Sequence, residues 1–218
     1  MASSTQNETR YESLARCRLC PRLVTHLEET REQHPDYHSA PVTAWGRTDA
    51  RLLIVGLAPG THGANRTGRP FTGDASGSFL FESLAAHGFA THPRADDAKL
   101  NNTRITNAVK CLPPQNKPNA REIKNCARYL DHELAQLWQP GFRRSRCVLC
   151  LGRVAHGSVA QVLNEPGLNF VHGQCFQAAP GLWLVDSYHP SRQNVNTGRL
   201  TQAMLDAVLA KVRGLLER

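Results

Sequence analysis

Short apolar runs alternate along this chain with segments of helical periodicity, and this order restricts the possible folds more than any other feature. Runs that indicate buried strands lie at residues 52–55, 105–109, 147–151 and 182–185. Helices are predicted from about Ser76 to Gly88, from a capping pair at Asn119 and Glu122 to about Trp138, over about 154–163, and from Thr201 onward. This order predicts a mostly parallel sheet between helical layers.

Length and composition limit the number of domains, the kind of partner and the location of the protein. With 218 residues, 40% of them hydrophobic, we expect one domain over 1–218, with 1–16 as a flexible N-terminal segment. The net charge of +8 suits a polyanionic partner. No apolar run reaches the roughly 20 residues that cross a bilayer, and the first residues lack the pattern of a secretory signal, so we expect no membrane association and a cytoplasmic location. There the seven cysteines are expected to be free thiols or metal ligands.

Three of the four loops that follow the predicted strands mix glycine or proline with polar groups. They read GLAPGTHGANRTGRPFTGDASG, NAVKCLPPQNKPN and DSYHPSRQNVNTGRL. Any one of them could be an ordinary turn. The carboxyl ends of parallel strands share one edge of a sheet, however, so three such loops together indicate a ligand site. The first loop has neither Walker spacing nor G-x-G-x-x-G, which argues against nucleotide triphosphate hydrolysis.

The cysteines separate into two groups by position. Cys17-x-x-Cys20-Pro is a usual turn for presenting two thiolates to a metal centre, and Cys111 and Cys126 could converge on it. By spacing alone, zinc and an iron–sulfur cluster are equally good occupants. Cys147 and Cys150 repeat the spacing inside a strand, where residues three apart point to opposite faces, so both are expected in the core. Cys175 has no partner in the sequence.

Four motifs occur in order: GLAPG at 56–60, GRPFTGDASG at 68–77, TNAVKC at 106–111 and HPSRQN at 189–194. With the cysteines, they resemble the uracil-DNA glycosylase superfamily and, within it, the iron–sulfur enzymes of family five (type B). The resemblance runs from about residue 17 to 199. It implies a three-layer α/β/α sandwich with a central four-stranded, mostly parallel sheet. It also implies a [4Fe-4S] cluster on Cys17, Cys20, Cys111 and Cys126.

The activity that the resemblance implies is DNA repair by hydrolysis of the N-glycosidic bond of uracil, and of other deaminated bases such as hypoxanthine, leaving an abasic site. The base would be flipped out of a DNA duplex, and the enzyme would act as a monomer. Two other classes stay open: a non-catalytic iron–sulfur DNA-binding protein and a hydrolase of small nucleosides. Action on free deoxyuridine would favour the latter.

The same resemblance assigns roles to side chains at the strand ends. Phe71 would stack on the base, and the amide of Asn107 would complement the donor and acceptor of uracil. His189 would donate to the uracil oxygen as negative charge grows on the leaving base. Asp74 would position water or stabilise the cationic sugar, or would cap a helix. The alternatives are a loop anchor for Phe71, a strand-end amide for Asn107 and a turn residue for His189.

The first and last motifs complete the predicted site. Gly56, Ala58 and Gly60 would line the base pocket, and many superfamily members carry Asp, Asn or Glu where Ala58 stands. This departure weakens the case for water activation there and suggests a broad substrate range. In the last loop, DNA contacts are expected from Ser191, Arg192, Gln193 and Asn194, and the segment to Leu200 could wedge into the gap left by the flipped base. A polar surface turn is the alternative.

Overall fold

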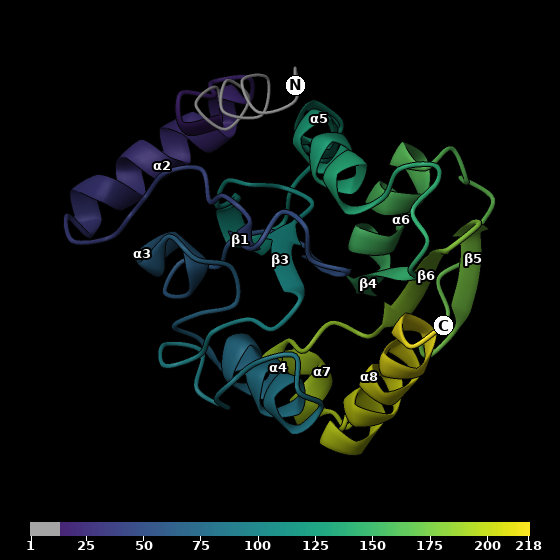
Figure 1. Ribbon diagram of the computed structural model, residues 1–218. Coiled ribbons are helices and arrows are strands. Elements are labelled where there is room, and N and C mark those ends of the chain that lie inside the picture. The colour runs from purple at the N-terminus through teal and green to yellow at the C-terminus, as the bar shows by residue number, and fades with distance from the viewer. Residues whose placement is uncertain (1–13) are drawn as a thin grey trace.

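A twisted sheet runs through the middle of the molecule in the computed structural model, which describes residues 14–218 (Figure 1). The predicted flexible segment 1–16 lies almost wholly outside the described residues, and Leu14 is already buried. The elements of the described chain are α2 (Pro21–Gln33), β1 (Trp45–Gly46), β2 (Leu52–Gly56), α3 (Ala64–Thr67), α4 (Ala75–Ala86), β3 (Thr103–Asn107), η1 (Pro114–Asn116), α5 (Ala120–Leu137), β4 (Arg146–Leu151), α6 (Arg153–Val162), β5 (Cys175–Ala179), β6 (Leu182–Ser187), α7 (Arg192–Asn196) and α8 (Gln202–Leu216).

The strands follow the order β1-β3-β2-β4-β6-β5, and the four inner strands run parallel. These are the four strands predicted from the apolar runs. The predicted total of four is wrong, because β1 and β5 add antiparallel strands at the two edges and bring the sheet to six. Neither edge strand carries a strong apolar run: β1 has two residues, and β5 reads CFQAA and is partly exposed.

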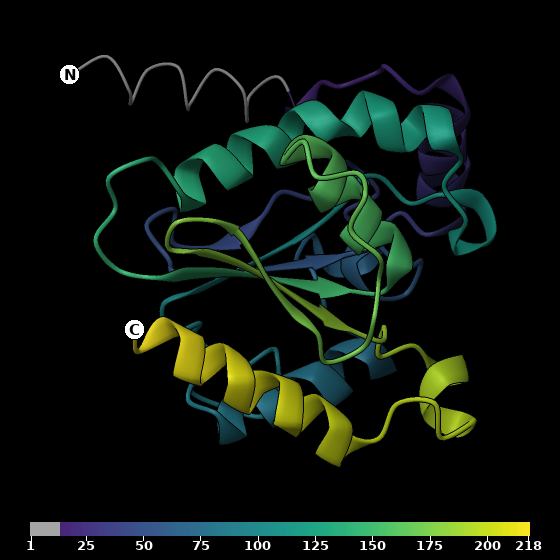
Figure 2. The ribbon, with the colours of Figure 1, turned by 90° about the vertical axis from the view of Figure 1, so that its right-hand side faces the viewer.

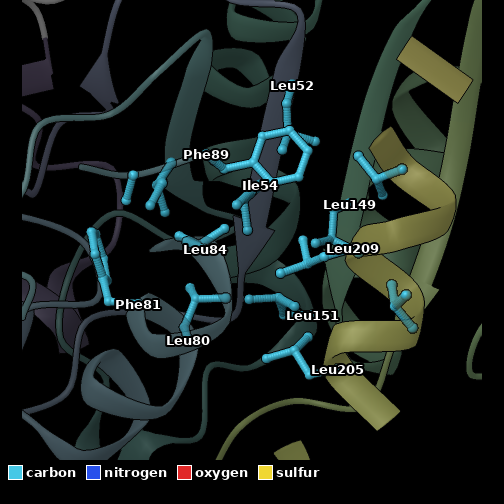
Figure 3. Close-up of a cluster of buried hydrophobic side chains, with 14 of the residues drawn as sticks. Leu52, Ile54, Leu80, Phe81, Leu84, Phe89, Leu149, Leu151, Leu205 and Leu209 are labelled. Carbon is cyan, nitrogen blue, oxygen red and sulfur yellow. The ribbon is translucent and has the colours of Figure 1, made fainter. Parts of the chain in front are cut away.

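Residues that alternate along the inner strands supply two separate apolar cores. Leu52 and Ile54 of β2 and Leu149 of β4 pack with α4 and α8, as Figure 3 shows. Leu53 and Val55 belong to the other core, which α5 and α6 complete. Helices therefore cover both faces of the sheet, with α5 and α6 on one side and α4 and α8 on the other (Figure 2). The predicted α/β/α layering is confirmed.

Helix starts agree closely with the capping patterns in the sequence. Asn119 accepts from the backbone N–H of Glu122, and the Glu122 carboxylate accepts from the N–H of Asn119, which completes the predicted capping box of α5. At the start of α8 the Thr201 hydroxyl accepts from the N–H of Met204, a single cap without the reciprocal bond. Within the described part of the chain, no helix is long and apolar enough to cross a membrane.

The connections leave a crevice at the carboxyl end of the sheet. From β2 the chain continues to α4 on one face, whereas from the neighbouring strands β3 and β4 it continues to α5 and α6 on the opposite face. Loops that leave adjacent strands toward opposite faces separate at the carboxyl end of the sheet. Ligands bind in the crevice between such loops in open α/β sheets. The ends of β2, β3, β4 and β6 are therefore where the predicted site residues should meet.

Candidate active site

Gly56 is the point around which the first site residues gather. It pairs in register with Asn107 at the end of β3. A Cβ atom placed on Gly56 would lie 2.5 Å from Asn107 Oδ1 and 2.6 Å from Phe71 Cε2. Such distances exclude any side chain at residue 56, so the amide and the aromatic ring both lie against its backbone. The structure thus brings together three of the predicted site residues from two strands and a loop.

Phe71 is held in this place by an unusual backbone. Its φ is +55°, a left-handed conformation that non-glycine residues rarely adopt. The surrounding turn supports it: the Thr72 hydroxyl donates to the Arg69 carbonyl at 2.9 Å and contacts the Thr67 hydroxyl, and the Phe71 carbonyl packs so closely on Gly77 that no Cβ would fit there. Backbone strain that is supported in this way is typical of functional sites. The ring is 7% exposed.

His189 follows β6 and approaches Phe71 from the other side. The two ring centroids are 5.9 Å apart. The Asn194 amide donates to the His189 carbonyl at 2.8 Å, which fixes the backbone of the loop. Gly152, with a φ of +95°, passes so near that its Cβ would lie 3.2 Å from His189 Cβ. Burial lowers the pKa of His189 to about 4, so its imidazole is neutral at physiological pH.

Asp74 has both features that the sequence suggested for it. Its Oδ1 accepts from the N–H of Gly77 at 2.9 Å, so it is the N-cap of α4. Its Oδ2 points toward the first loop: a Cβ on Gly63 would lie 2.1 Å from it, and one on Gly60 would lie 3.5 Å from it. The cap is confirmed, and a second carboxylate oxygen is left beside the loop that contains Gly60.

Ala58 lies in that same loop, partly buried, with no polar group to offer. Its methyl group packs against the apolar cluster that contains Cys111 and Cys126. The loop is tied to the next one by two backbone hydrogen bonds, from the Ala108 N–H to the Gly56 carbonyl and from the Val109 N–H to the Leu57 carbonyl. The first loop therefore connects the base pocket with the cysteines.

The last loop is a short helix where a loop was expected. Ser191 accepts from the N–H of Asn194 and is the N-cap of α7, while Arg192 and Gln193 are exposed. Leu200 is 0% exposed and belongs to the main core, so it is not available as a wedge. Only the exposed turn before it could enter DNA.

Four cysteines meet at a second site, between α2, the loop after β3 and α5. Cys17, Cys20, Cys111 and Cys126 line one small pocket whose other walls are mostly apolar: Leu14, Leu19, Leu23, Val24, Asn125 and Tyr129. Burial raises the pKa of Cys126 to about 11 and raises that of Cys111 further. The backbone N–H of Lys110 donates to Cys126 Sγ at 3.3 Å, and the Asn125 amide donates to Cys20 Sγ at 3.4 Å. The predicted convergence of these four residues is present in the structure.

The other cysteines lie elsewhere, as predicted for two of them. Cys147 and Cys150 are fully buried in β4 and belong to opposite cores. Cys175 lies on the edge strand β5. All seven cysteines are in the described part of the chain, and each has a free thiol.

A cleft beside His189 contains residues that the sequence did not single out. The guanidinium of Arg153 lies 5.5 Å from the ring of Phe170, and that of Arg199 lies 4.8 Å from the ring of Tyr188. Arg153 lies two residues after the end of β4, so its position close behind a strand is the signal that the sequence offers. The cleft is lined by Leu57, Leu151, Gly152, Arg153, Val154, Phe170, Tyr188, His189, Asn194 and Arg199.

A parallel sheet that carries an aromatic ring, an amide and a neutral imidazole at one edge is the arrangement implied by the sequence resemblance, and comparison with known proteins agrees. A family model described as the uracil DNA glycosylase superfamily matches residues 43–213. The chain therefore belongs to the uracil DNA glycosylase superfamily.

Within that superfamily, several Type-5 enzymes match this chain over most of its length. It is 42% identical to the Type-5 uracil-DNA glycosylase of Thermus thermophilus over 94% of this chain and 95% of the relative. The Type-5 enzyme of Pyrobaculum aerophilum is 42% identical over 91% of this chain and 88% of its own. A Type-4 uracil-DNA glycosylase from Pyrobaculum aerophilum is 31% identical over 71% of this chain and 74% of its own. The predicted resemblance to family five is confirmed.

Proposed function

We propose that this protein removes uracil from DNA by hydrolysing the bond between the base and the deoxyribose, leaving an abasic site. The observation that carries the proposal is that Asn107 and Phe71 both lie against the bare backbone of Gly56, while the His189 ring lies beside the Phe71 ring. These groups come from the loop after β2, the end of β3 and the loop after β6, at one sheet edge, and the names of the Type-5 relatives agree with this activity.

Each of the three side chains has a separate task in this proposal. Phe71 stacks on the flipped base, while the amide of Asn107 donates to one group of the uracil edge and accepts from its neighbour. As the glycosidic bond breaks, negative charge grows on the base, and the neutral imidazole of His189 donates to a uracil oxygen. A neutral imidazole suits this step, because it has an N–H to donate and does not have to change its protonation state.

Water is the remaining reactant, and Asp74 is the proposed group that directs it. Its Oδ1 is occupied by the helix cap, but its Oδ2 faces the loop around Gly60 and Gly63. A carboxylate there can orient water or stabilise the positive charge that develops on the sugar. The methyl group of Ala58 can neither orient water nor stabilise that charge. Because Ala58 removes one polar constraint beside the base, it also supports a substrate range that includes hypoxanthine.

The proposed cofactor is a [4Fe-4S] cluster on Cys17, Cys20, Cys111 and Cys126. The four thiols surround one apolar pocket, and N–H donors reach the Sγ atoms of Cys20 and Cys126, as is usual around iron–sulfur clusters. The spacing of the cysteines suits zinc equally well, and the resemblance to family five favours the cluster. The cluster would cross-link α2 to α5 and takes no part in base removal.

The partner in this proposal is double-stranded DNA, contacted by a monomer in the cytoplasm. The net charge of +8 and the cleft beside His189, with Arg153 and Arg199 on its walls, support a polyanion at this edge. Exposed Arg192 and Gln193 on α7 would contact phosphates. None of the seven cysteines, all of which the structure describes, forms a disulfide, and this suits a reducing compartment.

The test uses labelled duplexes that carry a single uracil, a hypoxanthine or only normal bases. Purified protein is expected to produce alkali-sensitive abasic sites at uracil, and more slowly at hypoxanthine, while normal duplexes stay intact. Free deoxyuridine serves as the control substrate: its cleavage would indicate a nucleoside hydrolase. Tight binding to the uracil duplex without any base release would indicate a non-catalytic DNA-binding protein.

Replacement of Asn107 by Asp is the matched variant for the same assay. It changes the donor and acceptor pattern at almost constant size, so single-turnover uracil release should fall far more than duplex affinity. An unchanged rate would remove Asn107 from base recognition.

A further inference from the structure

Lys110 is a lysine without contact to solvent, three residues beyond Asn107. Its side chain is 0% exposed. All three ammonium hydrogens have acceptors: the Thr106 hydroxyl at 2.5 Å, the Asn107 carbonyl at 2.8 Å and the Glu133 carboxylate at 2.7 Å. A lysine has three donors, so the ammonium is fully satisfied within the protein.

Glu133 fixes the far end of this network on helix α5. It is 1% exposed, and its second oxygen accepts from the Thr106 hydroxyl at 3.1 Å. An ion pair buried to this degree contributes little net stability, because removing both charges from water costs about as much as their attraction returns. A gain in folding free energy therefore does not account for the pair.

What the pair does hold is the end of β3. Thr106 and Asn107 are the last residues of that strand, and Lys110 bonds to the side chain of one and the main chain of the other. Only two rotatable bonds separate the Asn107 main chain from its amide. The amide lies directly against Gly56 and close to Phe71, so a shift of the strand end moves it within the base pocket.

We propose that Lys110, anchored by Glu133, is a positioning residue for the Asn107 amide; this proposal rests on the function proposed above. Lys110 is fully enclosed and contacts no base itself. It acts by fixing the main chain at Asn107, so that the amide meets the uracil edge without reorganisation. A misplacement of about 1 Å in such a group can slow a reaction by roughly 10²-fold.

The test replaces both charges together, as Lys110→Met with Glu133→Leu, because apolar side chains in place of a whole buried pair usually leave a protein folded. We expect thermal unfolding, iron content and affinity for an abasic-site duplex near those of the parent, with single-turnover uracil release slowed roughly 10- to 100-fold. A folded double variant that releases uracil at the parent rate would overturn the proposal.

The same replacement is then made in the Asn107→Asp background. If Lys110 acts through Asn107, the double replacement should slow the Asn107→Asp variant little further. An independent structural role would instead slow the reaction by the same factor in both backgrounds. Full additivity overturns the proposal. If the parent protein releases no uracil, it is the proposed function that fails.

Two further variants keep the test decisive. Thr106→Val preserves shape and removes one acceptor of Lys110, so it should give a smaller slowing that is also absent in the Asn107→Asp background. Should the charge replacement fail to fold, an unchanged rate in Thr106→Val would overturn the proposal. Ser83→Ala is the control, since it breaks a partly buried hydrogen bond to Asp206 between α4 and α8, on the face of the sheet opposite α5 and Glu133. It should lower stability without slowing release.

Discussion

His189 is a neutral imidazole held between Phe71 and Gly152, and its task in the proposed reaction is to stabilise the leaving base. His189→Ala removes one preorganised donor, a change that typically costs roughly 10²-fold in rate. Single-turnover release from a uracil duplex at saturating enzyme should fall by that order, while affinity for an abasic-site duplex stays close to that of the parent. Lost affinity with an unchanged rate would assign His189 to DNA binding.

The low pKa of His189 also makes stability depend on pH. In the unfolded chain a histidine has a pKa of about 6.5, whereas burial lowers that of His189 to about 4. Between these values only the unfolded state takes up the proton, so the free energy of unfolding falls as the pH drops from about 6.5 toward 4, by up to about 1.4 kcal/mol per pH unit. Urea unfolding of the parent and His189→Asn at pH 7, 6 and 5 should show a shallower decline in the variant. Parallel declines would contradict the assignment.

Asp74 combines a cap and a free carboxylate oxygen, and two substitutions separate these features. Asp74→Asn retains an oxygen that can accept from Gly77 but removes the charge, so stability should change little while uracil release slows by roughly 10- to 100-fold. Asp74→Ala should slow release as much and also lose about 1 kcal/mol of stability. Thermal unfolding and single-turnover assays of both variants check this, and full activity in Asp74→Asn would leave the residue as a cap only.

Some site residues could be predicted from the sequence because they follow strands and belong to motifs: Phe71, Asp74, Asn107 and His189 meet at one edge as expected. Lys110 could not be found in this way. Lysine is among the residues least often buried, and nothing in TNAVKC indicates that its side chain turns back to its own strand. Its partner Glu133 lies 23 residues further along. Only the fold brings the two charges together.

At the scale of elements, the inner strands and most helices were predictable because their apolar periodicity is strong. Helix α2 was not predicted: its buried residues Leu23, Leu27 and Thr30 form a thin stripe on a polar helix. The sequence predicts a loop in place of α7, because its five residues RQNVN have no apolar stripe. Helix α2 gets its structure from packing against the cluster that contains Cys111 and Cys126, whereas α7 is held by local hydrogen bonds of Ser191 and Asn194.

Helix α7 presents Arg192 outward, beside the proposed DNA path, while Ser191 and Asn194 hold the helix to the His189 loop. Arg192→Ala should therefore weaken duplex binding for uracil and normal sequences alike and reduce the slope of log K against log[salt] by about 1. Release at saturating enzyme should be unchanged. Binding measured at several salt concentrations checks this, and a variant that is slow at saturation would place Arg192 in the chemistry.

For the whole molecule, the proposed cluster joins α2 and the loop after β3 to α5, and Arg22 adds a charged contact from α2 to Glu122. Cys17→Ala should lower iron content and stability because it removes one of four ligands. Cys147→Ala is the matched control, since it removes a buried thiol in β4 and should keep its iron while losing about 1 kcal/mol. Iron analysis after anaerobic purification and thermal unfolding check both variants. Equal iron loss, or zinc in place of iron, would contradict the ligand set.

The proposed reactive groups and the end of the last helix lie at opposite ends of the sheet. Every proposed reactive group lies at the carboxyl ends of the strands, whereas the last helix finishes at the amino end, where the Arg51 guanidinium donates to the Leu216 carbonyl at 2.7 Å. The five residues of β2 separate these ends by roughly 16 Å. A linker attached after Arg218 therefore starts on the side away from the edge that is proposed to face DNA. A chain anchored by that linker to a glass surface or an electrode would present this edge to the solution, which makes it suited to an immobilised sensor for uracil in DNA.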